Sequence, residues 1–224
     1  MSGDRHSVAE TPELIVDELE KAKREAENGI RQYQMALEII RSHVHDAERP
    51  FRLRQHMILG LQDAALRGIH PLAGTFRNTP VKIGQSKHQP PDALHVSDEV
   101  ADMCDYVNSK WNEASAIHLA AYVLWKLNWI HPFADGNGRT SRTISYVIMS
   151  IKLNSVLPGT PTIPEQIAAD KGPYYDALEE ADTHWTQECI NVCALEDMVS
   201  RMLAKQLLSA ANEAAGQNNS KAQP

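Results

Sequence analysis

The sequence is poor in cysteine, with only Cys104, Cys189 and Cys193 among its 224 residues. Their number and spacing fit neither a disulfide framework nor a zinc-binding pattern. The ten histidines are scattered and none lies in an HExxH arrangement, so a catalytic zinc site is not expected. A chain with so few cysteines suits a reducing compartment, and we expect it to be cytoplasmic.

The chain also lacks an excess of positive charge and a long uninterrupted apolar segment. Its 29 acidic and 22 basic residues give a formal net charge of −7, which argues against general nucleic-acid binding. The longest apolar run, residues 115–130, is too short and too interrupted by Lys126 and Asn128 to span a bilayer. The first residues, MSGDRHSVAETPE, are polar and do not read as a signal peptide. We therefore expect neither a nucleic-acid partner nor a membrane.

Strand signals are rare, and helical patterns fill most of the chain, which predicts a mainly α protein. Residues 1–9 and the polar C-terminal tail are predicted to be disordered, and residues 155–163 to form a loop. The predicted helices cover residues 12–48 (with a break near Asn28-Gly29), 50–67, 97–113, 115–130, a segment ending near 153, 172–182 and 186–213.

Residues 131–142, HPFADGNGRTSR, form the most informative segment. They follow the apolar run 115–130, which predicts a buried helix. Pro132 biases His131 away from the α region, so this helix should end at or just before His131, at the mouth of a loop. An imidazole with an ordinary pKa of about 6.5 can accept a proton there at neutral pH.

The second half of this segment predicts an anion site. The tetrapeptide 135–138, DGNG, is typical of a turn, because glycine and asparagine tolerate positive φ. Helical spacing resumes after it, so the turn leads into a helix whose first N–H groups attract anions. Arg139 and Arg142 lie three positions apart on the first helical turn, where they can clamp phosphate oxygens. Asp135 is a hard oxygen ligand that suits Mg²⁺ beside those phosphates.

Two other meanings of this turn do not fit. A calcium loop would need an oxygen ligand at its fifth position and a glutamate at its twelfth, where the chain has Arg139 and Tyr146. A Walker A loop would need a G-K-[ST] ending, which does not follow.

Together these residues resemble the signature of the Fic family, HxFx(D/E)GNGRxxR. Members of this family mostly transfer the AMP part of ATP to a hydroxyl of another protein. The resemblance implies a Fic-like helical bundle with a small β-hairpin flap. It divides the chain into an N-terminal helical extension with a possible inhibitory role (1–50), a Fic catalytic domain (51–200) and a C-terminal helix end with a mobile tail (201–224).

The resemblance also implies a role for each motif residue. His131 is expected to take the proton of the attacking hydroxyl, and Asp135 to hold Mg²⁺. One of two neighbouring tyrosines is expected near the adenine, the alternative being that both are ordinary half-buried helix residues. The nucleotide-binding residues implied are Gly136, Asn137, Gly138, Arg139 (β-phosphate), Arg142 (γ-phosphate), Tyr174 and Tyr175.

A second stretch, residues 74–91, GTFRNTPVKIGQSKHQPP, resembles the flap of the family. Residues 81–83 alternate as a short strand, Gly84 allows a turn, and two prolines end the element. In Fic proteins the flap binds the target segment by strand addition. The target-binding residues expected in this chain are Val81, Lys82, Ile83 and Gly84.

The reaction implied is transfer of AMP from ATP, with Mg²⁺, to a Ser, Thr or Tyr hydroxyl of a protein substrate. Related kinases carry lysine at the position of Gly138, so this glycine favours AMP transfer over γ-phosphoryl transfer. The alternatives are removal of AMP from a target, phosphocholine transfer, and a catalytically silent binding protein with the same fold. Self-modification and a homo-oligomer are both compatible with the sequence.

Many Fic proteins also carry an inhibitory helix with the pattern [ST]xxxE[GN], whose glutamate pairs with the second motif arginine, here Arg142. No stretch matches this pattern in full. Glu27 fits except that Lys23 replaces Ser or Thr, whereas Glu213 fits except at the last position. We expect Glu27 to be the inhibitory residue, with Glu213 and the absence of an internal inhibitor as alternatives.

Overall fold

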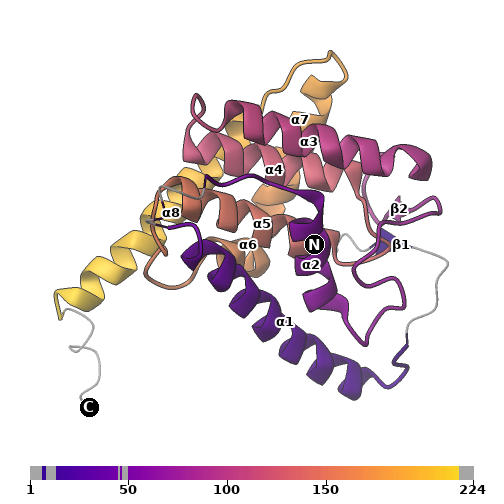
Figure 1. Cartoon of the computed structure of the whole chain (residues 1–224), viewed down its shortest axis with the longest axis horizontal. Coiled ribbons are helices and arrows are strands. Elements are labelled where there is room, and N and C mark those ends of the chain that lie inside the picture. The colour runs from indigo at the N-terminus through magenta and orange to yellow at the C-terminus, as the bar shows by residue number, and fades with distance from the viewer. Residues whose placement is uncertain (1–6, 9–13, 45, 47–49, 217–224) are drawn as a thin grey trace.

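The computed structural model describes residues 7–8, 14–44, 46 and 50–216, and it is built almost entirely of helices (Figure 1). The described residues also form two very short strands. The prediction of a mainly α protein is confirmed. The elements are β1 (Ser7–Val8), α1 (Glu18–Arg41), α2 (Gln55–Leu66), β2 (Lys82–Ile83), the 3₁₀ turn η1 (Ala93–His95), α3 (Val96–Lys110), α4 (Ala116–Ile130), α5 (Asn137–Lys152), α6 (Ile163–Ala169), α7 (Gly172–Trp185) and α8 (Cys193–Ala214).

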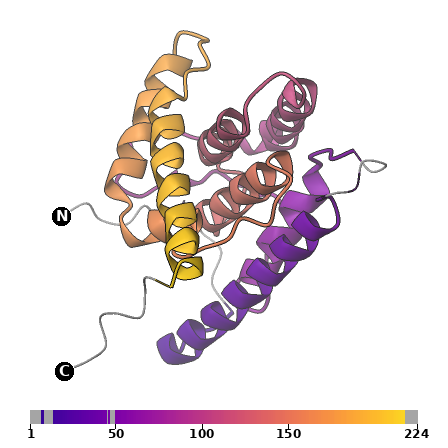
Figure 2. The ribbon, with the colours of Figure 1, turned by 90° about the vertical axis from the view of Figure 1, so that its left-hand side faces the viewer.

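The centre of the bundle is the pair α4 and α5, joined by the turn at 131–136. Helix α4 is apolar on every side, and a helix of this kind must be covered all round. It contacts α3, α5, α7 and α8. Figure 2 shows α7 and α8 on one side of this pair, and α1 with α2 on the other. The close packing of the two central helices fixes the turn between them.

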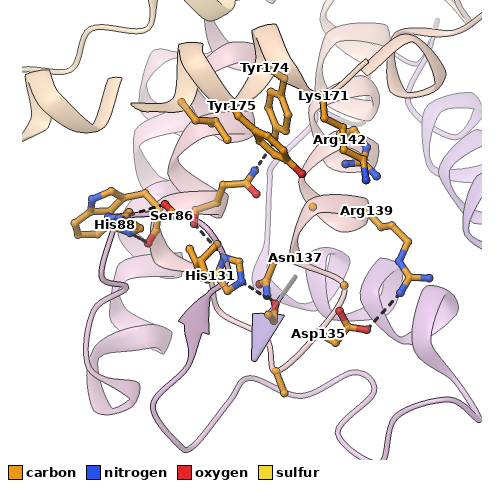
Figure 3. A pocket seen from close by; sticks show the side chains of 18 of the residues that line it. Ser86, His88, His131, Asp135, Asn137, Arg139, Arg142, Lys171, Tyr174 and Tyr175 are labelled. Atoms are coloured by element: carbon orange, nitrogen blue, oxygen red, sulfur yellow. Dashed lines mark hydrogen bonds and ion pairs between the residues drawn. The ribbon is translucent and has the colours of Figure 1, made fainter. Parts of the chain in front are cut away.

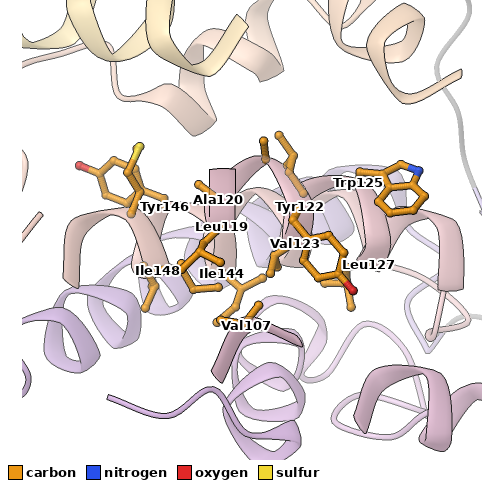
Figure 4. Packing of buried hydrophobic residues seen from close by; sticks show 14 of the residues in the cluster. Val107, Leu119, Ala120, Tyr122, Val123, Trp125, Leu127, Ile144, Tyr146 and Ile148 are labelled. Carbon is orange, nitrogen blue, oxygen red and sulfur yellow. The ribbon is translucent and has the colours of Figure 1, made fainter. Parts of the chain in front are cut away.

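Large apolar side chains from both central helices interlock in the core (Figure 4). Leu119, Val123 and Leu127 repeat at four-residue spacing on α4, and Ile144 and Ile148 do so on α5; all five are fully buried. Interiors are packed as densely as organic crystals, so a core of this kind holds its helix ends in place.

The predicted break in α1 is wrong, because the helix runs without interruption through Asn28 and Gly29. The side chain of Asn28 is fully buried and its amide donates to the carbonyl oxygens of Ala65 (3.2 Å) and Arg67 (2.9 Å), at the end of α2. Asn28 therefore caps the neighbouring helix rather than its own. Gly29 faces open space.

Helix α6 was not predicted, although its N-terminal signal is present in the sequence. Thr162 and Glu165 form a capping box, in which the carboxylate accepts from the Thr162 backbone N–H at 2.6 Å. Two prolines near this signal, Pro161 and Pro164, favour a loop. Pro164, however, lies in the first turn of α6, where a helix does not use the backbone N–H that proline lacks.

Strand β2 belongs to the predicted flap, but its partner comes from the N-terminus of the chain. Strands β1 and β2 pair antiparallel, with Ser7 opposite Ile83 and Val8 opposite Lys82. Disorder was therefore the wrong prediction for residues 7 and 8; the remainder of 1–9 and the tail 217–224 lie outside the described residues. The turn after β2 places Gln85, not Gly84, in the left-handed region, at φ 58°.

Within the part of the chain that the structure describes, no helix combines the length and apolarity needed to cross a membrane.

Candidate active site

A cavity of about 670 Å³ lies over the turn that joins α4 to α5 (Figure 3). The flap, the start of α7 and the first half of α1 close its other sides. The structure therefore brings together most of the predicted site residues, from three separate stretches of sequence; Val81, Lys82, Gly84 and Glu27 do not line the cavity. Those that line the cavity are His131, Asp135, Gly136, Asn137, Gly138, Arg139, Arg142, Tyr174, Tyr175 and, from the flap, Ile83.

His131 stands where α4 ends, in the left-handed region at φ 50° and ψ 59°. A non-glycine residue held there is strained, and such strain is concentrated at functional sites. Its ring is 4% exposed, with Nδ1 at 3.3 Å from the carbonyl oxygen of Asn128. Since a carbonyl can only accept, Nδ1 carries the proton and Nε2 has a free lone pair.

The pKa of His131 differs from the ordinary value that the sequence suggested. Burial lowers the pKa of this imidazole to about 4, against the hydrogen bond to the Asn128 carbonyl oxygen, which raises it; nearby Arg77 lowers the pKa and Asp135 raises it. At neutral pH the ring is therefore uncharged, as a proton acceptor must be.

Asn137 holds the shape of the turn with its side chain. Its Oδ1 accepts from the Phe133 N–H at 2.9 Å, and its Nδ2 donates to the Phe133 carbonyl oxygen at 2.8 Å. Phe133 is fully buried and packs on Phe76, with ring centroids 5.7 Å apart. The amide is thus engaged by the turn, and its Nδ2 also donates to the Ser7 hydroxyl at 3.2 Å, so the backbone N–H of Asn137 is the group that could bind a phosphate.

The start of α5 is a ready anion site. The first N–H groups of a helix have no intrahelical acceptor, and Gly136, its N-cap, offers no side-chain cap. Gly136 has φ +81°, and a Cβ there would lie 2.8 Å from Leu66 Cδ2, so any other residue would be strained at this position. Across the part of the chain that the structure describes, the Arg142 guanidinium has no hydrogen-bond or ion-pair partner, and it faces the same cavity.

Arg139, in contrast, has two acidic neighbours. Its guanidinium lies 3.4 Å from Asp135 Oδ2 and 3.4 Å from Glu25 Oε1 of α1. All three side chains are about one-third exposed, and ion pairs of this kind are weak. A phosphate could therefore displace Glu25 at small cost.

The predicted pairing of Glu27 with Arg142 is wrong. Glu27 pairs with Arg24 on its own helix at 3.6 Å, and it does not line the cavity. The reason is helical geometry: residues two apart on a helix point in different directions, so Glu25 faces the site and Glu27 faces away. The rival residue Glu213 accepts from Ser209 on α8.

The two tyrosines of α7 have different surroundings. Tyr174 is buried, and its hydroxyl accepts from Asn128 Nδ2 at 2.7 Å, so it ties α7 to α4. Tyr175 is only partly buried beside the cavity, with its ring centroid 5.7 Å from that of Tyr174. Both line the cavity, and Tyr175 is the less buried of the two (Figure 3).

Two residues that support the site were not predicted. Arg77 is 3% exposed and donates to the carbonyl oxygens of His131 (2.8 Å), Thr79 (3.1 Å) and Pro91 (2.6 Å), which binds the flap to the end of α4. Gln62 of α2 donates to the Asp135 carbonyl oxygen at 3.1 Å. Both act through tertiary contacts, which leave no periodic signal in the sequence.

Comparison with known proteins agrees with this geometry. Residues 52–149 match the model of the Fic/DOC family. Protein adenylyltransferase fic-1 of Caenorhabditis briggsae is 35% identical over 127 residues, which is 56% of this chain but only 23% of that protein. Over these residues the chain is similar to the Fic/DOC family, and the whole chain spans about a quarter of the length of such relatives.

Solved structures show the same fold. Fic-1 (residues 134–508) of Caenorhabditis elegans superposes with a TM-score of 0.64 at 22% identity, covering 85% of this chain and 52% of that chain. The BepC protein of Bartonella tribocorum, solved with bound AMPPNP, superposes with a TM-score of 0.56 at 17% identity, covering 84% of this chain and 88% of that chain.

Proposed function

We propose that this chain is a protein adenylyltransferase, which transfers AMP from ATP to a hydroxyl side chain. The proposal rests above all on one contact: Nε2 of the buried, neutral His131 lies 2.8 Å from the hydroxyl oxygen of Ser7, which is held on the flap by strand pairing. A hydroxyl that faces a general base is what this reaction needs. The Caenorhabditis briggsae relative is a protein adenylyltransferase by name.

The phosphates of ATP would bind at the start of α5. Its unpaired N–H groups and the unpartnered Arg142 would hold the β- and γ-phosphates, with Arg139 joining them once Glu25 is displaced. Gly138 leaves room beside Arg142, because even a Cβ there would approach its Nη1 to 3.3 Å. A lysine would crowd this position, so the arrangement favours attack at the α-phosphorus. Tyr175 offers its ring to the adenine.

Asp135 suits Mg²⁺. Its carboxylate lines the cavity next to the proposed phosphate position, and only one of its oxygens, Oδ2, is near Arg139. Mg²⁺ in nucleotide sites is commonly held by one or two carboxylates together with phosphates and water, so a single aspartate is sufficient. The ion would neutralise charge on the phosphates.

The chemical step would be proton removal by His131. As the hydroxyl oxygen attacks the α-phosphorus, Nε2 takes its proton, and the Nδ1–H bond to the Asn128 carbonyl keeps the ring oriented. The depressed pKa makes the ring a weak base, so most of the acceleration would come from positioning and from the charges around the phosphates.

The test is transfer from ATP labelled either on the α- or on the γ-phosphate, with the purified chain and a mixture of proteins. We expect label only from the α-position, and none with His131→Ala, which should still bind ATP. Label from the γ-position would identify a kinase and overturn the proposal.

We further propose that α1 inhibits the site through Glu25 rather than Glu27. Its carboxylate occupies Arg139, where the β-phosphate would bind, so ATP must compete with it. The same carboxylate favours a second candidate activity, removal of AMP from a modified target, in which Glu25 would position the water. Release of free AMP from a modified protein would distinguish that activity.

A further inference from the structure

The N-terminus of this chain occupies the edge of the flap. Ser7 and Val8 add to β2 as an antiparallel strand, although 75 positions separate Ser7 from Lys82 (Figure 1). Strand addition places alternate side chains on opposite faces, so the register decides which side chain faces the cavity. In this register Ser7 lies opposite Ile83, and both line the cavity.

The hydroxyl of Ser7 both donates and accepts a hydrogen bond within the site. It donates to Nε2 of His131 at 2.8 Å, since that nitrogen carries no proton, and it accepts from Asn137 Nδ2 at 3.2 Å. Asn137 is the first residue of α5, where the phosphates are proposed to bind. The oxygen therefore lies between the base and the anion site, as an attacking nucleophile must.

Two other hydroxyls that line the cavity are held differently. Ser86 Oγ accepts from the His88 N–H at 3.2 Å within the flap turn, and the Tyr174 hydroxyl is bound to Asn128. Among the described residues, Ser7 alone has its hydroxyl within hydrogen-bonding distance of His131 Nε2.

We propose that Ser7 is the site of intramolecular self-modification with AMP. This inference rests on the proposed function. The Ser7 oxygen forms a bond to the α-phosphorus of ATP, and the bond between that phosphorus and the oxygen bridging to the β-phosphate breaks. The Ser7 proton passes to His131 Nε2, and pyrophosphate leaves. The product is the chain with AMP esterified to Ser7.

Attachment to the same chain gives this serine an advantage over free targets. A tethered group reaches the site at a high effective concentration, which converts the reaction to a unimolecular step. The strand is only two residues long, and so short a strand is weakly held. It can leave the flap after reaction and make room for another segment.

The test is mass spectrometry of the full chain after incubation with ATP and Mg²⁺, with the adduct located by fragmentation of its peptides. We compare wild type with Ser7→Ala, and with Ser2→Ala as a control from the same N-terminal stretch. We expect one AMP on Ser7 in wild type and in Ser2→Ala, and its loss in Ser7→Ala. The rate should not depend on protein concentration.

Three results would overturn the inference in distinguishable ways. An AMP adduct elsewhere that persists in Ser7→Ala would reject Ser7 and leave the adenylyltransferase intact. No adduct on the chain would also reject Ser7, and α-labelled ATP added with other proteins would then show whether His131-dependent transfer survives. A rate that rises with protein concentration would reject the intramolecular route.

Discussion

His131 combines burial, a strained backbone and an unprotonated nitrogen that faces a hydroxyl. Because burial excludes water from the ring, the charged form is disfavoured and its pKa falls to about 4. The unfolded chain carries this histidine with an ordinary pKa of about 6.5. Between these two values the unfolded state binds more protons than the folded one.

This difference predicts how the histidine titrates and how it affects stability. In the ligand-free protein the His131 ring signals in NMR spectra should remain those of neutral imidazole from pH 7 down to about 5. The free energy of unfolding should decrease as pH falls from about 6.5 towards the lower pKa, and His131→Gln should weaken that decrease. A titration midpoint near 6.5 in the folded protein would contradict the assignment of burial as the cause.

Arg77 is a second residue whose pKa and hydrogen bonds depend on its surroundings in the folded protein. Burial lowers the pKa of its guanidinium, although Asp92 raises it, and backbone carbonyls of the flap and of the end of α4 satisfy its N–H groups. We expect Arg77→Ala to lower the free energy of unfolding by about 3 kcal/mol, because it leaves several carbonyl oxygens buried without donors.

Urea unfolding measures this effect, and Arg67→Ala is the matched control. Arg67 is largely exposed, and within the described part of the chain its side chain pairs with Asp63 of α2, so its removal should cost less than about 1 kcal/mol. Equal losses in the two variants would contradict the role given to Arg77.

The residues for which we propose direct chemical roles lie in a segment that the sequence alone singles out, whereas the residues that support them could not be predicted. The turn DGNG and the spacing of His131, Arg139 and Arg142 define local geometry that a short segment carries by itself. Arg77 and Gln62 contact the site from distant segments. The lowered pKa of His131 also depends on burial, which needs the assembled bundle.

At the scale of elements, α1 places Glu25 against Arg139. Glu25→Gln should raise the affinity for ATP by about two- to fivefold, which is the range expected for loss of a partly exposed ion pair. Glu27→Gln is the matched control on the same helix and should leave the affinity unchanged. Isothermal titration with MgATP measures both, and a larger effect at Glu27 would return the inhibitory role to that residue.

The junction between α4 and α5 depends on one glycine. Gly136→Ala should lower the free energy of unfolding by about 1–3 kcal/mol, because alanine is strained at this positive φ. The new methyl group would also press against Leu66, which should lower it further. Gly29→Ala is the matched control, since Gly29 lies inside α1 and faces open space. It should raise the free energy of unfolding by about 0.5–1 kcal/mol. Thermal unfolding distinguishes the two; a tolerated Gly136→Ala would show that the turn is less constrained.

Helices with strong apolar periodicity, such as α4 and α5, were predicted close to their observed bounds. The errors arose where tertiary contacts outweighed local signals. Asn28 looked like the end of α1 and instead binds the end of α2. The capping box before α6 lies beside prolines, which favour a loop over a helix. Strand β1 has no apolar alternation of its own and forms only because β2 offers an open edge.

At the scale of the whole molecule, different parts of the chain build the site. The core pair α4 and α5 supplies His131 and the helix start at Asn137, the flap supplies an edge that β1 pairs with, and α1 places the Glu25 carboxylate against Arg139. The N-terminal residues 7 and 8 join these parts, because they pair with the flap and bring a hydroxyl to the base.

The most direct test of AMP transfer by this site is intact mass spectrometry of the full chain and of His131→Ala after incubation with ATP and Mg²⁺. We predict a mass gain of one AMP in the wild-type chain and no gain in His131→Ala, while both proteins bind ATP with similar affinity. A gain equal to a phosphoryl group, or an AMP adduct that persists in His131→Ala, would contradict the role of this turn as an adenylyl-transfer site with His131 as its base.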